Sequence, residues 1–153
     1  MRPDIKVWNP ENPAQWNKTL AWTTVWLSTF SLTLGFCAWF LVPSLAPRLN
    51  EIGFSLTHSQ LYWLVAMVGL SAGTLRILWT FLPPILGTRI LVTLSTGLLL
   101  IPLFCWVYAA QHPDTPYWML ICFALLSGIG GGTFSGLMAS TNYFFPKHER
   151  GLA

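Results

Sequence analysis

Arg76 is the residue of this chain whose surroundings most need a chemical explanation. No charged residue occurs from Leu61 to Leu75 or from Ile77 to Thr88, so the arginine interrupts a long apolar stretch. A cation at membrane depth costs about 3 to more than 10 kcal/mol, so it faces a protein interior or a wet cavity and meets an anion. A guanidinium offers a planar fork of donors that matches two oxygens of one small anion. Arg76 therefore predicts an anion site. The competing interpretation is a structural arginine bonded to helix carbonyls.

The rest of the sequence lacks the patterns of catalysis, metal binding or nucleic-acid binding. Cys37, Cys105 and Cys122 share no metal-like spacing and form no disulfide framework. No nucleophile has a base nearby, and no two carboxylates are paired. Lys and Arg residues are spread singly, without a basic stripe. We therefore predict a protein that is not an enzyme and that has no metal, no cofactor and no nucleic-acid partner.

Long apolar runs place the chain in a lipid bilayer. Of the 153 residues, 54% are hydrophobic and only 8% are charged. The runs between charged residues exceed the roughly 20 residues that cross a bilayer as a helix, and they lack the alternation of barrel strands. We predict an all-α membrane protein with four transmembrane helices, at about 21–43, 60–82, 90–109 and 117–141. Pro83 and Pro84 are expected to end the second of them.

The distribution of basic residues predicts the orientation in the membrane. Six lie on one side of the predicted spans and only Arg48 lies on the other; the six are Arg2, Lys6, Lys18, Arg89, Lys147 and Arg150. The positive-inside rule then predicts a multi-pass protein of the cell (inner) membrane with a cytoplasmic N-terminus. The expected organisation is a cytoplasmic segment 1–18, a four-span region 19–145, and the start of a cytoplasmic loop at 146–153.

The fourth predicted span is rich in glycine. Gly128, Gly132, Gly136 and Ser140 recur every four residues, and Ser127, Gly131, Ser135 and Ala139 form the adjacent row. Two neighbouring ridges of this helix are therefore nearly bare, which predicts close helix packing; Gly130 belongs to the same glycine-rich run. A phosphate-binding loop is the alternative, but it needs a strand before the glycines and usually a Lys after them. Gly69 and Gly73 form a smaller version in the second span. Arg76 follows on roughly the same face, so we expect it to point toward a neighbouring helix.

Three segments together resemble the nitrate/nitrite porters of the major facilitator superfamily. They are Gly73-Thr-Leu-Arg76, Gly128-Ile-Gly-Gly-Gly-Thr-Phe134, and Tyr143-Phe-Phe-Pro-Lys147 with His-Glu-Arg-Gly151 after it. The opening Trp8-Asn-Pro-Glu-Asn-Pro-Ala-Gln-Trp16 is similar too, so the likeness covers essentially the whole chain. Between the second and third spans the sequence departs from the superfamily pattern, of which only Gly87 and Arg89 remain.

The resemblance implies the first part of an N-terminal half whose substrate site lies between two six-helix halves. The partners would be nitrate and nitrite anions, the lipid bilayer and the remaining helices of a full-length porter. Arg76 matches the first-half arginine, and Phe36 and Phe134 match aromatic walls of the pocket, although by themselves they read as packing residues. No Asp or Glu lies in a predicted span, which favours nitrate-in/nitrite-out exchange over proton symport.

The chain stops where the family pattern would enter its fifth span. We therefore expect an N-terminal fragment that does not transport by itself. The alternative is a complete four-span protein that oligomerises into an anion channel, with Arg76 repeated around a central pore.

Overall fold

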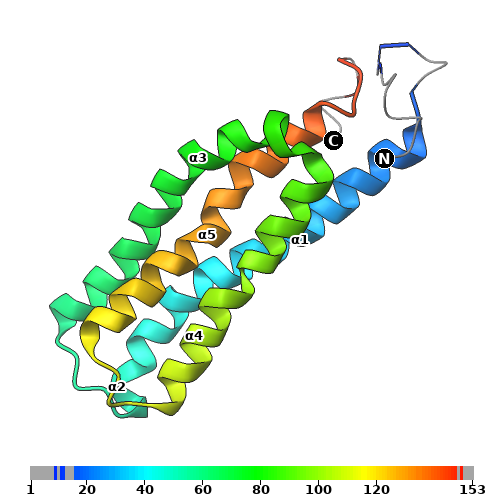
Figure 1. Cartoon of the computed structure of the whole chain (residues 1–153). Helices are drawn as coiled ribbons and strands as arrows, with labels where there is room; N and C mark the ends of the chain where they lie inside the picture. Colours follow the sequence, from blue (N-terminus) through cyan, green and yellow to red (C-terminus); the bar gives the residue numbers. More distant parts are fainter. Residues whose placement is uncertain (1–8, 10, 13–15, 148, 150–153) are drawn as a thin grey trace.

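Helices form all the regular structure in the part of the chain that the computed structural model describes, residues 9, 11–12, 16–147 and 149, as the all-α expectation requires. They are α1 (Lys18–Leu45), the 3-10 turn η2 (Ala46–Arg48), α2 (Leu49–Ile52), α3 (His58–Leu98), α4 (Leu100–Gln111) and α5 (Tyr117–Asn142) (Figure 1). Most of the predicted segment 1–18 and much of the predicted loop 146–153 lie outside the described residues.

Local signals in the sequence set the helix starts. The Asn17 side chain accepts a hydrogen bond from the Leu20 N–H at 3.1 Å and so satisfies a free donor at the start of α1. Thr57 and Gln60 form a reciprocal capping box at the start of α3. Gly53 ends α2 with φ 120°, a conformation that glycine adopts without steric cost.

The chain reverses direction within α3. Gly87 has φ 72° and ψ 156° and divides the helix into two arms, 58–86 and 88–98. The indole N–H of Trp79 donates to the Oγ of Ser95 at 2.9 Å. A continuous helix would separate two residues 16 positions apart by about 24 Å. The arms therefore lie side by side, and Figure 1 shows the chain turning back at the top of the view.

The end of the first arm differs from the prediction. Pro83 and Pro84 lie inside α3, and the break occurs at Gly87 instead. The two prolines remove N–H donors, but their fixed φ is helical and the chain continues through them. The chain leaves the helix at Gly87 through a positive φ, which glycine adopts without steric cost. The boundary between α3 and α4 at Leu99 lies three residues before Pro102, which cannot donate to the Leu98 carbonyl.

Three stretches of the described chain are long and apolar enough to cross a membrane: Lys18–Ile52, His58–Gln111 and Tyr117–Ala139. The predicted count of four spans is therefore not confirmed. The second and third predicted spans fall together in one stretch of 54 residues, His58–Gln111, which contains the bend at Gly87. Many large apolar side chains on these helices are exposed, as in a protein whose outer surface contacts lipid. The chain is an integral membrane protein.

Helix α5 occupies the middle of the bundle. In the most apolar part of the stretch Tyr117–Ala139, 67% of the residues are buried, against 28% in the most apolar part of each of the other two stretches. It packs against α3 and α1 and, more lightly, against α4, and Figure 1 shows it running between the two arms of α3. A helix enclosed on several sides needs small side chains where its neighbours come close, which is where the glycine-rich run lies.

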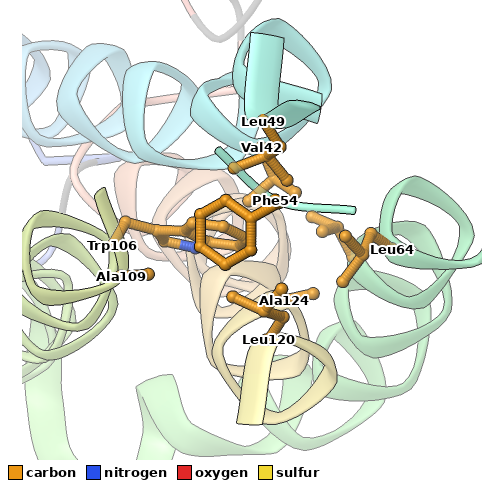
Figure 2. Packing of buried hydrophobic residues seen from close by; sticks show 9 residues of the cluster. Val42, Leu49, Phe54, Leu64, Trp106, Ala109, Leu120 and Ala124 are labelled. Atoms are coloured by element: carbon orange, nitrogen blue, oxygen red, sulfur yellow. The ribbon is translucent and has the colours of Figure 1, made fainter. Parts of the chain in front are cut away.

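One hydrophobic cluster closes the end of the bundle at α2. Figure 2 shows the Phe54 ring among residues of α1, α3, α4 and α5, with Trp106 beside it. The Trp106 indole N–H donates to the Ser127 Oγ at 2.9 Å, so its polar atom is satisfied although the ring is buried. A Cβ added at Gly53 would lie 3.3 Å from the Cβ of Pro113. The loops after α2 and after α4 therefore meet at the same end of the bundle.

Candidate functional site

Arg76 lies at the edge between α3 and α5. Its Nε donates to the carbonyl oxygen of Gly131 at 3.2 Å, while the side chain as a whole is exposed. The Arg76 carbonyl accepts a hydrogen bond from the Ser135 hydroxyl of α5 at 2.9 Å, which ties this turn of α3 to its neighbour, and a second from the Thr80 hydroxyl of α3 itself at 2.7 Å. Arg76 therefore points toward a neighbouring helix, as expected, and bonds to it through Nε, although the residue as a whole is exposed.

The rest of the guanidinium has no acceptor among the described residues. Neither of its Nη atoms makes a hydrogen bond or an ion pair there. No Asp or Glu occurs between Glu51 and Asp114, or between Asp114 and Glu149, so the sequence places no carboxylate in the long apolar stretches. A guanidinium with free donors and no internal counter-charge is built to meet an anion from outside the chain.

Aromatic rings from two other helices flank this guanidinium. The Cζ of Arg76 lies 5.7 Å from the ring centroid of Phe134 on α5 and 6.0 Å from that of Trp39 on α1. Phe36 packs edge-on against Phe134, with 6.0 Å between the ring centroids, and lies 5.8 Å from Trp39. The structure therefore brings the three predicted residues together, with Phe36 in contact with Phe134 and not directly with the arginine.

Trp39 is absent from the residues that the sequence singled out for the site. It follows Phe36 by three positions on α1, so the two side chains share one face of that helix. That spacing was the available signal. It carries little information alone, because aromatic residues three apart on an apolar helix are ordinary packing residues.

The glycine-rich run lies where α5 meets α1 and α3. A Cβ at Gly128 would lie 2.5 Å from the Ser71 side chain, and one at Gly132 would lie 2.7 Å from the Leu75 Cβ. A Cβ at Gly130 would overlap the carbonyl oxygen of Gly35 on α1. At Gly131 and Gly136 it would come within 2.8 Å of the Ala72 Cβ and 2.9 Å of the Trp79 carbonyl oxygen. Side chains at these five positions would push the helices apart.

Gly69 and Gly73 behave differently from the prediction. A Cβ at either position would meet no atom within 4 Å. The side of α3 that packs on α5 instead carries the buried residues Val68, Ser71, Ala72 and Trp79. One residue rotates a helix by about 100°, so Gly69, Gly73 and Arg76 lie on the neighbouring face, which is exposed.

The motif Tyr143-Phe-Phe-Pro-Lys147 packs against the start of the chain. Phe145 is 1% exposed, and its ring meets Trp22 edge-on at 5.6 Å and Trp16 at 6.4 Å. The Trp16 indole N–H donates to the Phe144 carbonyl at 3.0 Å, and the Lys147 N–H donates to the Glu11 carboxylate at 3.1 Å. These contacts hold the segment after α5 to the start of α1 and to the residues before it.

Metal ligands do not gather in the described part of the chain, where no group of three His, Cys, Asp or Glu side chains could hold an ion. The described cysteines are not bonded to one another.

Comparison with known proteins identifies the family. Residues 6–153 match the Major Facilitator Superfamily. The chain belongs to this superfamily. It is 60% identical over 149 residues to a Thermus thermophilus protein described as a probable nitrate/nitrite antiporter NarK2, covering 97% of this chain and 34% of that relative. It is 40% identical to the nitrate/nitrite transporter NarU of Salmonella typhimurium, covering 95% of the chain and 32% of NarU.

A more distant relative is also described as a nitrate transporter. A Staphylococcus aureus protein described as a probable nitrate transporter NarT is 32% identical over 127 residues, covering 83% of this chain and 31% of that relative. The chain thus spans about a third of the length of the curated relatives it matches. All three relatives are named as transporters and none as an enzyme. These similarities agree with the resemblance to nitrate/nitrite porters that was inferred from the sequence motifs.

Proposed function

We propose that this chain forms part of a membrane porter that exchanges nitrate for nitrite and that Arg76 is its anion-binding residue. The observation that carries the proposal is the guanidinium of the exposed Arg76, which is fixed through Nε to Gly131 and has no internal counter-charge. Nitrate and nitrite are small planar anions whose oxygens match two parallel N–H donors. Phe134 lies beside the arginine with Phe36 packed against it, and the two rings would exclude water, which strengthens the contact.

The distribution of titratable groups favours exchange over proton coupling. Proton-coupled porters place a carboxylate or His at membrane depth. Here all five acidic residues, and all three histidines, lie outside the spans predicted from the sequence. An anion leaving in place of the one that entered keeps the charge of the site balanced without a proton.

We further propose that the 54-residue stretch His58–Gln111 crosses the membrane twice, which gives four crossings in all. The Trp79–Ser95 hydrogen bond, which joins its two arms, supports this. So does the contact of Gly53 with Pro113, because loops at one end of the bundle belong on one side of the membrane. The excess of basic residues near both ends of the chain favours cytoplasmic termini and the inner membrane.

Other helices would complete the site. One arginine on an open face cannot enclose an anion, and the curated relatives are about three times as long as this chain. In porters of this architecture the substrate lies between two repeats that rock against each other. The exposed face with Arg76, Gly69 and Gly73 is the side on which we place the missing wall.

The test uses a chimera in which this chain replaces the matching third of the Thermus thermophilus relative. We expect the chimera to take up labelled nitrate into cells without nitrate or nitrite porters, faster when they are preloaded with nitrite. Arg76→Lys should lose most of this uptake, because lysine keeps the charge but not the paired donors. Arg89→Lys, an exposed arginine in the bend, is the matched control and should transport normally. Normal uptake by a well-inserted Arg76→Lys variant would make Arg76 structural.

A further inference from the structure

Trp39 is held in place by the glycine-rich face of α5. A Cβ added at Gly131 would lie 3.1 Å from two ring atoms of Trp39, Cδ2 and Cε2. A Cβ added at Gly130 would lie 3.3 Å from the Trp39 Cβ. The indole therefore rests directly on the backbone of α5, in a place that only glycines leave open. Phe36 and Phe40 pack on it from α1, with ring centroids 5.8 and 5.1 Å away.

The same indole lies beneath the arginine. The Arg76 Cζ is 6.0 Å from the Trp39 ring centroid and 5.7 Å from that of Phe134, so rings from two helices flank one guanidinium. An aromatic face attracts a cation through its quadrupole, and it attracts more strongly where water is excluded. A guanidinium also stacks on such a ring, which a lysine ammonium does not do.

The hydrogen bond of Nε fixes which edge of the guanidinium remains available. Because Nε donates to Gly131, the side-on pair made of Nε and one Nη is already used. The end pair, with one donor from each Nη, has no acceptor among the described residues. If the Nε hydrogen bond were its only contact, the guanidinium plane could still rotate about the side-chain bonds next to it. The Trp39 ring limits that rotation.

We propose that Trp39 is a positioning residue for the anion site, and that it holds the Arg76 guanidinium so that its two Nη atoms receive the anion end-on. This inference rests on the proposed function. It assigns the glycines a role besides packing: Gly131 supplies the acceptor for Nε and also the space in which the indole lies. Trp39 acts through Arg76, by its ring face and not by its N–H.

A purely structural role for Trp39 is the alternative, since its ring also packs against the buried cluster around Val42 and Leu64. The two roles differ in what they change. A packing residue sets the stability of the empty protein and the maximal rate. A positioning residue sets the affinity for nitrate, which appears in the KM and in the rise of the unfolding temperature that a ligand produces by binding only the folded state.

The experiment compares variants of the chimera by nitrate uptake and by thermal unfolding with and without nitrate. Trp39→Leu removes the ring, and we expect the KM for nitrate to rise roughly tenfold, with the maximal rate within about twofold. The nitrate-induced rise in unfolding temperature should shrink accordingly. Trp39→Phe keeps a ring face without the N–H and should stay close to the unchanged chimera. Trp26→Leu is the matched control, because Trp26 is an exposed tryptophan of the same helix that does not flank Arg76, and its KM should be unchanged.

Two results would overturn the inference and leave the proposed function standing. If Trp39→Leu lowers stability and maximal rate with an unchanged KM, the indole is a packing residue. If Trp39→Phe is as impaired as Trp39→Leu, the N–H and not the ring is what matters. Should Trp39→Leu fail to insert, Trp39→Met takes its place with a flexible apolar chain. A chimera that neither transports nitrate nor is stabilised by it would overturn both proposals together.

Discussion

Trp79 donates its indole N–H to the Oγ of Ser95 at 2.9 Å, and this bond joins the two arms of α3 across the bend at Gly87. Trp79 is 7% exposed and Ser95 is 1% exposed, so neither polar group has ready access to water. A buried donor left without an acceptor costs about 1–3 kcal/mol. The pair therefore stabilises the hairpin of α3 and not either arm alone.

This pairing predicts a measurable loss of stability in Ser95→Ala. The change leaves the indole N–H without its acceptor, and we expect the free energy of unfolding to fall by about 1–3 kcal/mol. Thr93→Ala is the matched control, because Thr93 is exposed and its hydroxyl bonds only to the Arg89 carbonyl of its own helix. Thermal unfolding of the chimera in detergent gives both values.

A double-mutant cycle separates the bond from other effects of the change. Once Trp79→Phe has removed the donor, adding Ser95→Ala should cost little more. Fully additive losses would mean that the two residues stabilise the bundle independently, and would argue against the bond as the tie between the arms.

Membrane crossing by both arms predicts that residues 51 and 114 are on the same side of the membrane. Single cysteines at Glu51 and at Asp114, in a background without native cysteines, should both react with an impermeant reagent from outside. A cysteine at Lys6 should react only after permeabilisation. The neighbouring Asn50 is unsuitable for labelling, because its side-chain amide donates to the Leu56 carbonyl and accepts from the Leu56 N–H and so holds the loop. If Glu51 and Asp114 are labelled from opposite sides, the stretch His58–Gln111 crosses once and the four-crossing proposal fails.

Much of the bundle could be predicted because its signals are local. Apolar runs predicted the first two spans to begin at about 21 and 60, within about three residues of the observed helix starts at Lys18 and His58, where Asn17 and Thr57 are the caps. The grouping of Arg76 with Phe134 and Phe36 came from the resemblance and not from spacing. A sequence alone gives no reason why these three residues, on three different helices, should meet.

The errors share a different cause, the rotation of one helix against another. Gly69 and Gly73 have the spacing of a packing face, but α3 turns Ser71 and Ala72 toward α5. Trp39 was overlooked because its partner, Arg76, is on another helix. Gly87 and not the Pro83-Pro84 pair reverses the chain, since two prolines fit a helix whereas a positive φ does not.

The contact between α1 and α5 predicts that Gly130→Ala is strongly destabilising. Its Cβ would overlap the Gly35 carbonyl oxygen, a backbone atom that cannot move aside without moving α1. We expect a loss of about 1–3 kcal/mol, as for other overpacked contacts, with lower yield of folded protein. Gly97→Ala is the control: it adds a Cβ in open space on a helix and should be neutral or stabilising by up to about 1 kcal/mol. Equal stability of the two variants would show that α1 and α5 do not need this glycine.

The open face at Arg76 predicts that residues 1–153 alone do not transport nitrate. Within the described chain only Nε of the guanidinium is hydrogen-bonded, its Nη atoms have no acceptor there, and Arg76 lies on an exposed face without a second wall. An anion on such a face keeps much of its water, and one set of helices has nothing to rock against. We expect labelled nitrate uptake at the empty-vector level from the chain alone, in cells without nitrate or nitrite porters, and clear uptake from the chimera at a similar level of inserted protein.

Comparing the chain alone with the chimera separates an incomplete porter from a complete channel. In a channel built from several copies, each Arg76 would receive its second wall from a neighbouring copy, and the chain alone would conduct nitrate. Uptake by the chain alone that disappears in Arg76→Ala would therefore favour the oligomeric channel and overturn the porter. Uptake that survives Arg76→Ala would arise elsewhere and would remove Arg76 from the site. With the chimera active and the chain alone inactive, the missing wall is what the remaining two thirds of the relative supply.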